Sequence, residues 1–238
     1  DLTINFPAAG TYTLASSHGQ SIFNKEPLTM NGIPSTGYAG LTVVEGGLTL
    51  KGTPDVTANM TYQTVVGAQV RQTNLNANAV MTIDGCKANI GGSGEHLFVG
   101  YGIAAGMPNR PEFNVINNGY VLVNALKTAG NAPAAVDVQI NVLNRGFFDS
   151  NWAIQFGSGN SANGKTTVRM SNSVMRCSGS GDFSFGSPID FVAGAGSVIT
   201  QTCTTGIIFR NNASGQMRLE GGSRLYYNQI RFENNSGV

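Results

Sequence analysis

The chain has 238 residues, of which 11% are charged, and its formal net charge at pH 7 is +1. Its 14 basic residues are scattered, which excludes a surface built for nucleic acid, and its 41% hydrophobic content excludes a disordered chain. No apolar stretch is long enough to cross a bilayer as a helix, so we expect no transmembrane helix and no membrane insertion.

The first 40 residues differ from the rest in their pattern of apolar and polar residues. Residues 2–7 are expected to form a strand closed by Pro7, and residues 10–14 a second strand. From Ser16 to Gly40 the sequence is punctuated by Gly, Pro and Ser with little periodicity. We predict that residues 1–40 form an N-terminal cap or entry region, because the first unit of a stacked structure must hide its apolar face.

Short alternating runs of apolar and polar residues recur from Leu41 onward, which is typical of half-buried strands. The clearest lie between Val136 and Phe232, where Gly, Ser or Asn interrupts each run and the alternation then resumes. Val138, Val168 and Val198 are about 30 residues apart, within the period range of repeat proteins. We therefore predict an all-β chain whose residues 41–238 form a right-handed parallel β-helix of about eight coils. A β-sandwich or jelly roll is the alternative, since it also has short, regularly spaced strands.

Three cysteines, Cys86, Cys177 and Cys203, lie far apart, with no C-x-x-C pair to suggest a zinc or redox site. We expect buried free thiols, as suits assembly in a reducing cytoplasm, and neither metal nor cofactor.

Four carboxylates are the candidate catalytic residues. Asp149 and Asp182 are about one coil apart, as are Asp190 and Glu220. Neighbouring strands are about 4.8 Å apart, so stacked carboxylates could approach the separation used by retaining glycosidases. The other interpretation is that these acids are solvated charges or cap backbone amides at corners.

The single tryptophan, Trp152, is a candidate carbohydrate-binding residue, because sugar rings stack on flat indole faces. Asn151 and Arg145 would supply polar contacts to sugar hydroxyls. Alternatively, Trp152 fills a layer of the core or a contact between subunits.

The Gly- and Asn-rich corners and the phrase Asn-Arg-Gly-Phe-Phe-Asp-Ser at 144–150 resemble the β-helical tail fibres and tailspikes of bacteriophages over Leu41 to Asn235. The resemblance implies a homotrimer in the virion tail, among other tail proteins, that recognises lipopolysaccharide or capsular polysaccharide on the host surface. It also leaves open a polysaccharide depolymerase, a hydrolase or lyase with acidic residues. The phrase Gly-Gly-Leu-Thr-Leu at 46–50 is similar to autotransporter adhesins and leaves a secreted adhesin as a further alternative. The first interpretation is a non-enzymatic receptor-binding or structural module.

Overall fold

The computed structural model describes residues 2–14, 21–23, 41–43, 46–60, 64–67, 78–90, 96–100, 110–129, 136–157, 164–210 and 213–233. These residues form strands and short connections, without a helix among them. Within the same ranges, no helix has the length and hydropathy needed to cross a membrane. The predicted all-β class with parallel strands is confirmed.

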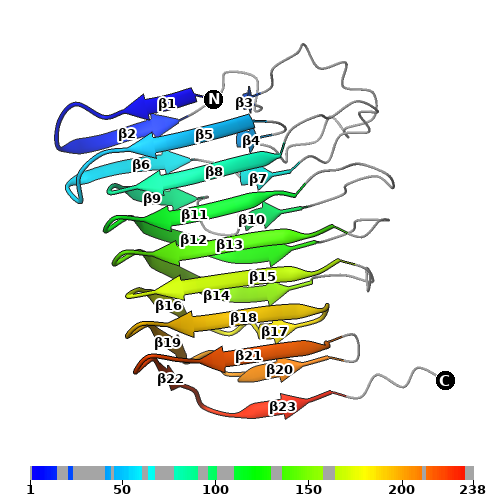
Figure 1. Cartoon of the computed structure of the whole chain (residues 1–238). Helices are drawn as coiled ribbons and strands as arrows, with labels where there is room; N and C mark the ends of the chain where they lie inside the picture. Colours follow the sequence, from blue (N-terminus) through cyan, green and yellow to red (C-terminus); the bar gives the residue numbers. More distant parts are fainter. Residues whose placement is uncertain are drawn as a thin grey trace.

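Eight strands form one sheet, the front sheet, which faces the viewer in Figure 1. Every neighbouring pair in it is parallel. In spatial order the strands are β1 (Leu2–Asn5), β5 (Gly46–Lys51), β8 (Ala79–Asp84), β11 (Glu112–Ile116), β13 (Val138–Leu143), β15 (Thr166–Ser171), β18 (Ile189–Gly194) and β21 (Gly215–Leu219).

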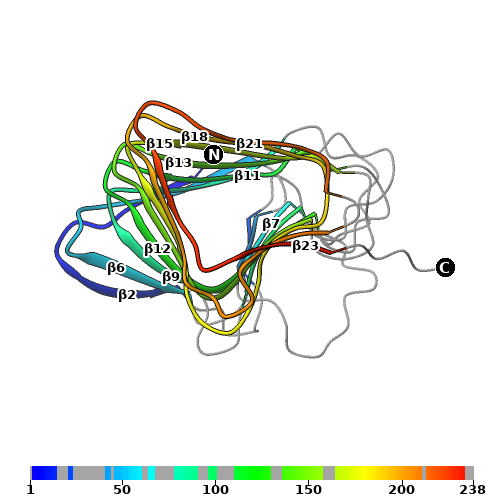
Figure 2. The same cartoon turned by 90° about the horizontal axis from the view of Figure 1, so that it is seen from below.

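The remaining fifteen strands form a bent second sheet with two limbs. Limb A contains β2 (Gly10–Leu14), β6 (Val56–Met60), β9 (Lys87–Ile90), the first parts of β12 (Tyr120–Thr128) and β14 (Phe147–Phe156), β16 (Val174–Cys177), β19 (Val198–Gln201) and β22 (Arg224–Tyr226). Limb B contains β3 (Ser21–Phe23), β4 (Leu41–Val43), β7 (Thr64–Val66), β10 (His96–Val99), the last parts of β12 and β14, β17 (Phe183–Phe185), β20 (Ile207–Phe209) and β23 (Ile230–Phe232). Seen along the stack, the front sheet and the two limbs enclose a shared interior (Figure 2).

The chain runs through the front sheet, limb A and limb B in turn and then adds the next strand to the front sheet, as from β13 through β14 to β15. The exception is the first level, where both β3 and β4 lie in limb B before the chain returns to the front sheet at β5. All pairings among the described strands are parallel, whereas a sandwich joins antiparallel strands. The three valine anchors are not equivalent, however. Val168 pairs with Ile140 in the front sheet, while Val198 pairs with Val174 in limb A. The prediction that these three anchors occupy equivalent positions in successive coils is therefore wrong.

The core consists of columns of side chains stacked from strand to strand. Alternation along each strand sends every second residue inward, as the burial pattern of β8 shows. One column in the front sheet is fully buried and comprises Leu48, Met81, Phe113, Ile140, Val168 and Phe191. A column in limb B is aromatic, with ring-centroid separations of 5.5 Å for Phe156–Phe185, 4.8 Å for Phe185–Phe209 and 5.3 Å for Phe209–Phe232.

Short turns join the front sheet to limb A, and several of them contain residues with left-handed backbone angles. Asn117 and Asn118, which follow β11, have φ values of 54° and 65°. Asn144 and Arg145, which follow the neighbouring strand β13, have φ values of 52° and 65°. The Asn144 side-chain amide donates a hydrogen bond of 3.3 Å to the Asn117 side-chain oxygen. Asn tolerates this conformation better than most residues, which explains the Asn-rich corners of the sequence.

The connections from limb B back to the front sheet vary in length. The shortest comprises residues 44–45 between β4 and β5, and residues 67–78 between β7 and β8 form one of the longest. Unequal connections at this corner break the sequence period while the stacking of strands continues.

Stacking begins at Leu2 rather than Leu41. β1 pairs with β5 and β2 pairs with β6, so strands from the predicted N-terminal cap already belong to the two sheets, while the division of the chain at residue 40 stays a prediction. Residues 15–20 and 24–40 of the expected cap lie outside the described ranges. At the other end, Leu219, Tyr226, Tyr227, Ile230 and Phe232 are exposed, because no further strand covers β21, β22 and β23 among the described residues.

Candidate functional site

Asp149 lies on the outward side of limb A yet is only 1% exposed. Its neighbours in register are Leu122 on β12 and Arg176 on β16. Arg176 holds the carboxylate with two hydrogen bonds, one from Nε at 2.8 Å and one from Nη2, and the Tyr120 hydroxyl donates a third at 2.9 Å. Burial, followed by the hydrogen bond to Asp149, raises the pKa of Tyr120 to about 12. Three donors therefore occupy a carboxylate that solvent barely reaches.

Asp182 does not stack on Asp149. Its backbone oxygen accepts a hydrogen bond from Ile154 N at 2.8 Å, which places it level with the later part of β14. Its carboxylate accepts a hydrogen bond of 2.5 Å from Arg210. The expected alignment of these two acids on adjacent strands is therefore wrong, because β14 has passed its bend before it meets the residues around Asp182.

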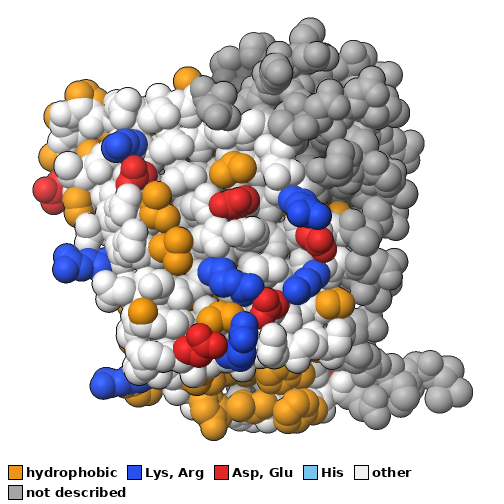
Figure 3. Space-filling view, viewed as in Figure 1, with side chains coloured by type: hydrophobic (Ala, Val, Ile, Leu, Met, Phe, Trp, Pro, Cys, Tyr) orange, Lys and Arg blue, Asp and Glu red, His pale blue; other side chains and the backbone are white. Residues whose placement is uncertain are grey.

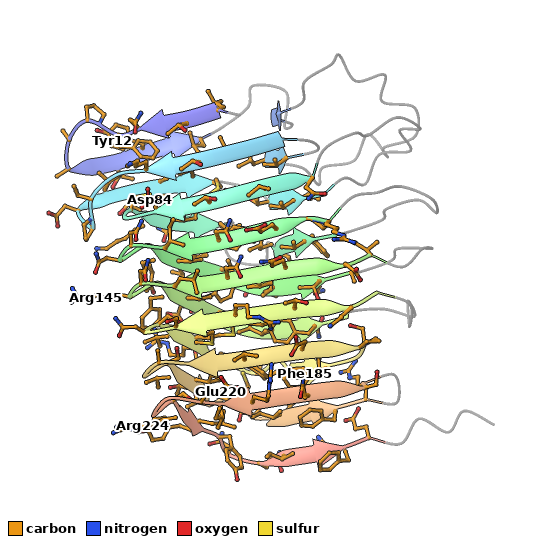
Figure 4. The ribbon with its side chains drawn as sticks, viewed as in Figure 1. Tyr12, Asp84, Arg145, Phe185, Glu220 and Arg224 are labelled. Atoms are coloured by element: carbon orange, nitrogen blue, oxygen red, sulfur yellow. The ribbon has the colours of Figure 1, made fainter. Side chains whose placement is uncertain are left out.

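Asp190 and Glu220 are not register partners either. Asp190 on β18 pairs with Thr167 on one side and Gln216 on the other, whereas Glu220 hydrogen-bonds through its backbone to Ala193. In Figure 4, Glu220 lies at the left end of β21, where the strand ends. Arg218 lies between the two acids, 3.6 Å from Asp190 and 3.8 Å from Glu220. The alignment expected for this pair is also wrong.

All four nominated acids thus form ion pairs with arginine. The pairs of Asp149 with Arg176, Asp182 with Arg210 and Asp190 with Arg169 each join neighbouring strand levels. The hydrogen bond from Arg169 is the main reason that the pKa of Asp190 is lowered. An acid held ionised in this way is a poor proton donor, so this carboxylate is unsuited to general-acid catalysis.

Trp152 lies where β14 bends from limb A into limb B. Val123 pairs with Ser150 and Ala125 with Ala153, so Asn151 and Trp152 together face a single residue of β12. Such a bulge redirects the side chains on the longer strand. The half-buried indole stacks on His96 with a centroid separation of 5.6 Å, and Lys127 Nζ lies 5.5 Å from its centroid. Part of the ring is therefore already covered.

Arg145 is not near Trp152. It lies in the turn before β14 and projects from the left edge of the stack in Figure 4. The strand from Phe147 to Trp152 alone spans roughly 16 Å. Asn151 is exposed beside Trp152, but the three residues predicted to bind one sugar do not converge.

A different site lies on the outer face of the front sheet. An open depression of about 340 Å³ is lined by residues 188–190 and 214–216 together with Lys165. Asp190 therefore belongs to it, while Arg169 and Arg218 lie next to the lining residues, where each contacts Asp190. Figure 3 shows Lys and Arg side chains gathered around acidic ones on the lower part of this face.

Sequence reasoning missed Lys165 and Gln216, which line the depression, and Arg218, which contacts Asp190 beside it. A signal was available for Arg218, because it follows Asp190 by about one strand-to-strand period. Only knowledge of the register, however, shows that Gln216 is the direct neighbour of Asp190.

The described ranges contain no group of three or more His, Cys, Asp or Glu side chains placed to hold a metal ion. Comparison with protein-family models, curated proteins and solved structures gives no match for this chain.

Proposed function

We propose that this chain is a right-handed parallel β-helix that acts as a rigid, non-catalytic glycan-binding module of a surface-exposed assembly, such as a bacteriophage tail fibre or tailspike. Parallel pairing throughout the described sheets and the repeated order of front sheet, limb A and limb B support the β-helical part of this proposal. The ladder of strands would make the module stiff, because each level is hydrogen-bonded to the next.

The depression at Asp190 is the observation that carries the binding function. Protein sites for small ligands are concave and contain a few polar groups in fixed positions. Here Lys165, Asp190, Ser214 and Gln216 offer charged, hydroxyl and amide groups at one open site. Such groups match the hydroxyl and charged substituents of a surface polysaccharide.

The arrangement of the acids favours binding over cleavage. A retaining glycosidase needs two carboxyl groups about 5 Å apart, one of them protonated. Each nominated acid instead faces an arginine, and neither predicted pair is aligned in register.

The binding test uses purified lipopolysaccharide and capsular polysaccharide immobilised on a biosensor. We expect the chain to bind at least one of them and Gln216→Ala to weaken that binding, while Thr200→Ala, on the outer side of limb A, leaves it unchanged. Equal binding by both variants would show that the polysaccharide does not bind at the depression.

Catalysis and assembly are tested separately. Incubation of the protein with the same polysaccharides should release no reducing ends or unsaturated sugars. Release that Asp190→Asn abolishes would establish the depolymerase alternative instead. Analytical ultracentrifugation should give the mass of a trimer if the chain assembles as proposed for a tail protein.

A further inference from the structure

We propose that the depression at Asp190 binds an anionic group on a sugar, such as the carboxylate of a uronic or sialic acid, with Lys165 and Arg218 as its main contacts. This inference rests on the proposed glycan-binding function and specifies its ligand.

Positive charge exceeds negative charge around the depression. Lys165, Arg169 and Arg218 carry three positive charges, whereas the acids that contact these arginines, Asp190 and Glu220, carry two negative ones. Among the described residues no carboxylate lies within 4 Å of Lys165 Nζ. The exposed ammonium group of Lys165 is therefore available to a ligand.

Lys165, Arg169 and Arg218 differ in how many hydrogen bonds and close ion pairs they already make within the protein. Arg169 is occupied, since it donates to the Asp190 carboxylate at 2.6 Å and to the backbone oxygen of Asp190 at 2.9 Å. Arg218 makes only long ion pairs of 3.6 and 3.8 Å, and its side chain is 47% exposed. An arginine with five N–H donors and no short contact within the described residues can still donate to a ligand.

Hydrogen-bonding capacity also favours an anion. Both oxygens of Asp190 are already engaged, one by Arg169 and the other by Gln216 Nε2 at 3.4 Å. The N–H donors of Lys165 and Arg218 therefore remain for a ligand, whereas both oxygens of Asp190 already have partners. A neutral sugar hydroxyl both donates and accepts, whereas a carboxylate or phosphate only accepts and gains a charge-assisted hydrogen bond.

The backbone beneath the depression is fixed by the strand ladder. Ile189 N donates to Ser214 O at 2.8 Å, and Thr166 N donates to Pro188 O at 2.9 Å. Gly215 has a φ of 106°, and a Cβ atom there would lie 2.0 Å from Ile189 O. Only glycine permits this approach of the two strands, so the floor of the site is set before any ligand arrives.

The experiment compares oligogalacturonate, a phosphorylated oligosaccharide and a neutral maltooligosaccharide of equal length by isothermal titration calorimetry at low and moderate salt. We expect an anionic probe to bind at least tenfold more tightly than the neutral one, and its affinity to fall as salt rises. Lys165→Gln and Arg218→Gln should each weaken that binding about tenfold. Arg224→Gln removes an exposed arginine from β22 and should have no effect, and circular dichroism checks the fold of every variant.

The outcomes separate the two proposals. If the neutral probe binds as tightly as the anionic ones and Lys165→Gln has no effect, the anionic specificity is overturned while glycan binding stands. If no probe and no surface polysaccharide binds, both proposals fail. Preference for the galacturonate or for the phosphorylated probe, lost in both variants, supports the inference and identifies which anion the site takes.

Discussion

Asp149 and Arg176 lie opposite each other on adjacent strands β14 and β16, and the arginine closes over a carboxylate that is only 1% exposed. Although they are far apart in the chain, they are neighbours along the stack. The pair links two levels through their side chains in addition to the backbone ladder, and its disruption should be measurable as lost stability.

Arg176→Ala should lower the free energy of unfolding by about 3 kcal/mol, because it leaves a buried carboxylate without its counter-ion. The guanidinium also packs 5.4 Å from the Phe147 ring centroid, a contact that would be lost too. Urea denaturation measures the change. Arg145→Ala, in an exposed turn, is the matched control and should stay within about 0.5 kcal/mol of the wild type. Equal effects of the two substitutions would contradict the role given to the Asp149–Arg176 pair.

Tyr120 should make stability depend on alkaline pH. Its pKa is raised to about 12 by burial and by its bond to Asp149, whereas an unfolded tyrosine ionises near pH 10. Because the neutral form is favoured in the folded state, its contribution is complete below about pH 10 and is lost as the pH rises towards 12.

Urea midpoints measured between about pH 9 and pH 12 test this dependence. The decline should be shallower in Tyr120→Phe than in the wild type. Tyr12→Phe, whose hydroxyl bonds to the Ala8 backbone oxygen in an exposed segment, should follow the wild-type curve. Parallel curves for Tyr120→Phe and the wild type would show that this hydroxyl does not couple folding to pH.

The aromatic column in limb B should contribute unequally along its length. Phe185 is fully buried between Phe156 and Phe209, whereas Phe232 at the end of the column is 82% exposed. Phe185→Ala should cost about 4 kcal/mol, and Phe232→Ala less than about 1 kcal/mol. Thermal and urea unfolding of both variants measure the difference. A cost at position 232 that matches the one at 185 would mean that the exposed end is covered in solution.

The thiols of Cys177 and Cys203 should form a disulfide when a mild oxidant is added. Their Sγ atoms are 2.7 Å apart and both residues are buried, whereas Cys86 lies elsewhere in the core. Diamide should take up two electrons and two protons from this pair and become the hydrazine, leaving one free thiol per chain. The hydrogen bond between the two thiols raises the pKa of Cys177 and lowers the pKa of Cys203, so Cys203 should supply the thiolate that attacks diamide.

Thiol titration in denaturant and intact mass measure the oxidation. Cys177→Ser should prevent the loss of thiols, and Cys86→Ser should not. Three titratable thiols after prolonged treatment of the native wild type would mean that the pair cannot close.

The strands could be predicted from the sequence because alternation depends only on neighbouring residues. The run Val138–Leu143 and the run Thr166–Ser171 are both strands of the front sheet. Their register could not be predicted, because it depends on the lengths of connections that carry no pattern. Within one buried column, the stretch of chain from Leu48 to its neighbour Met81 is clearly longer than the stretch from Val168 to Phe191.

The errors at the candidate site arise because the register between strands could not be predicted from the sequence. The expected spacing of about one coil places Asp182 above Asp149, whereas the structure puts Arg176 there. The bulge that redirects Trp152 likewise depends on how many residues β14 and β12 each use at the bend. The side chains that line the depression come from different strands, so no single stretch of sequence predicts the site.

The corner between limb B and the front sheet is a place where the sequence of such a protein can vary in length. Its connections differ widely in length, yet the strands on either side keep their hydrogen bonds and their buried columns. Residues can be inserted or deleted there at small entropic cost, because the closure penalty grows only slowly with loop length. The depression at Asp190 borders this corner, where residues 186–188 enter β18. Variation in these connections can therefore change the surface around the depression while the strands beneath it stay the same.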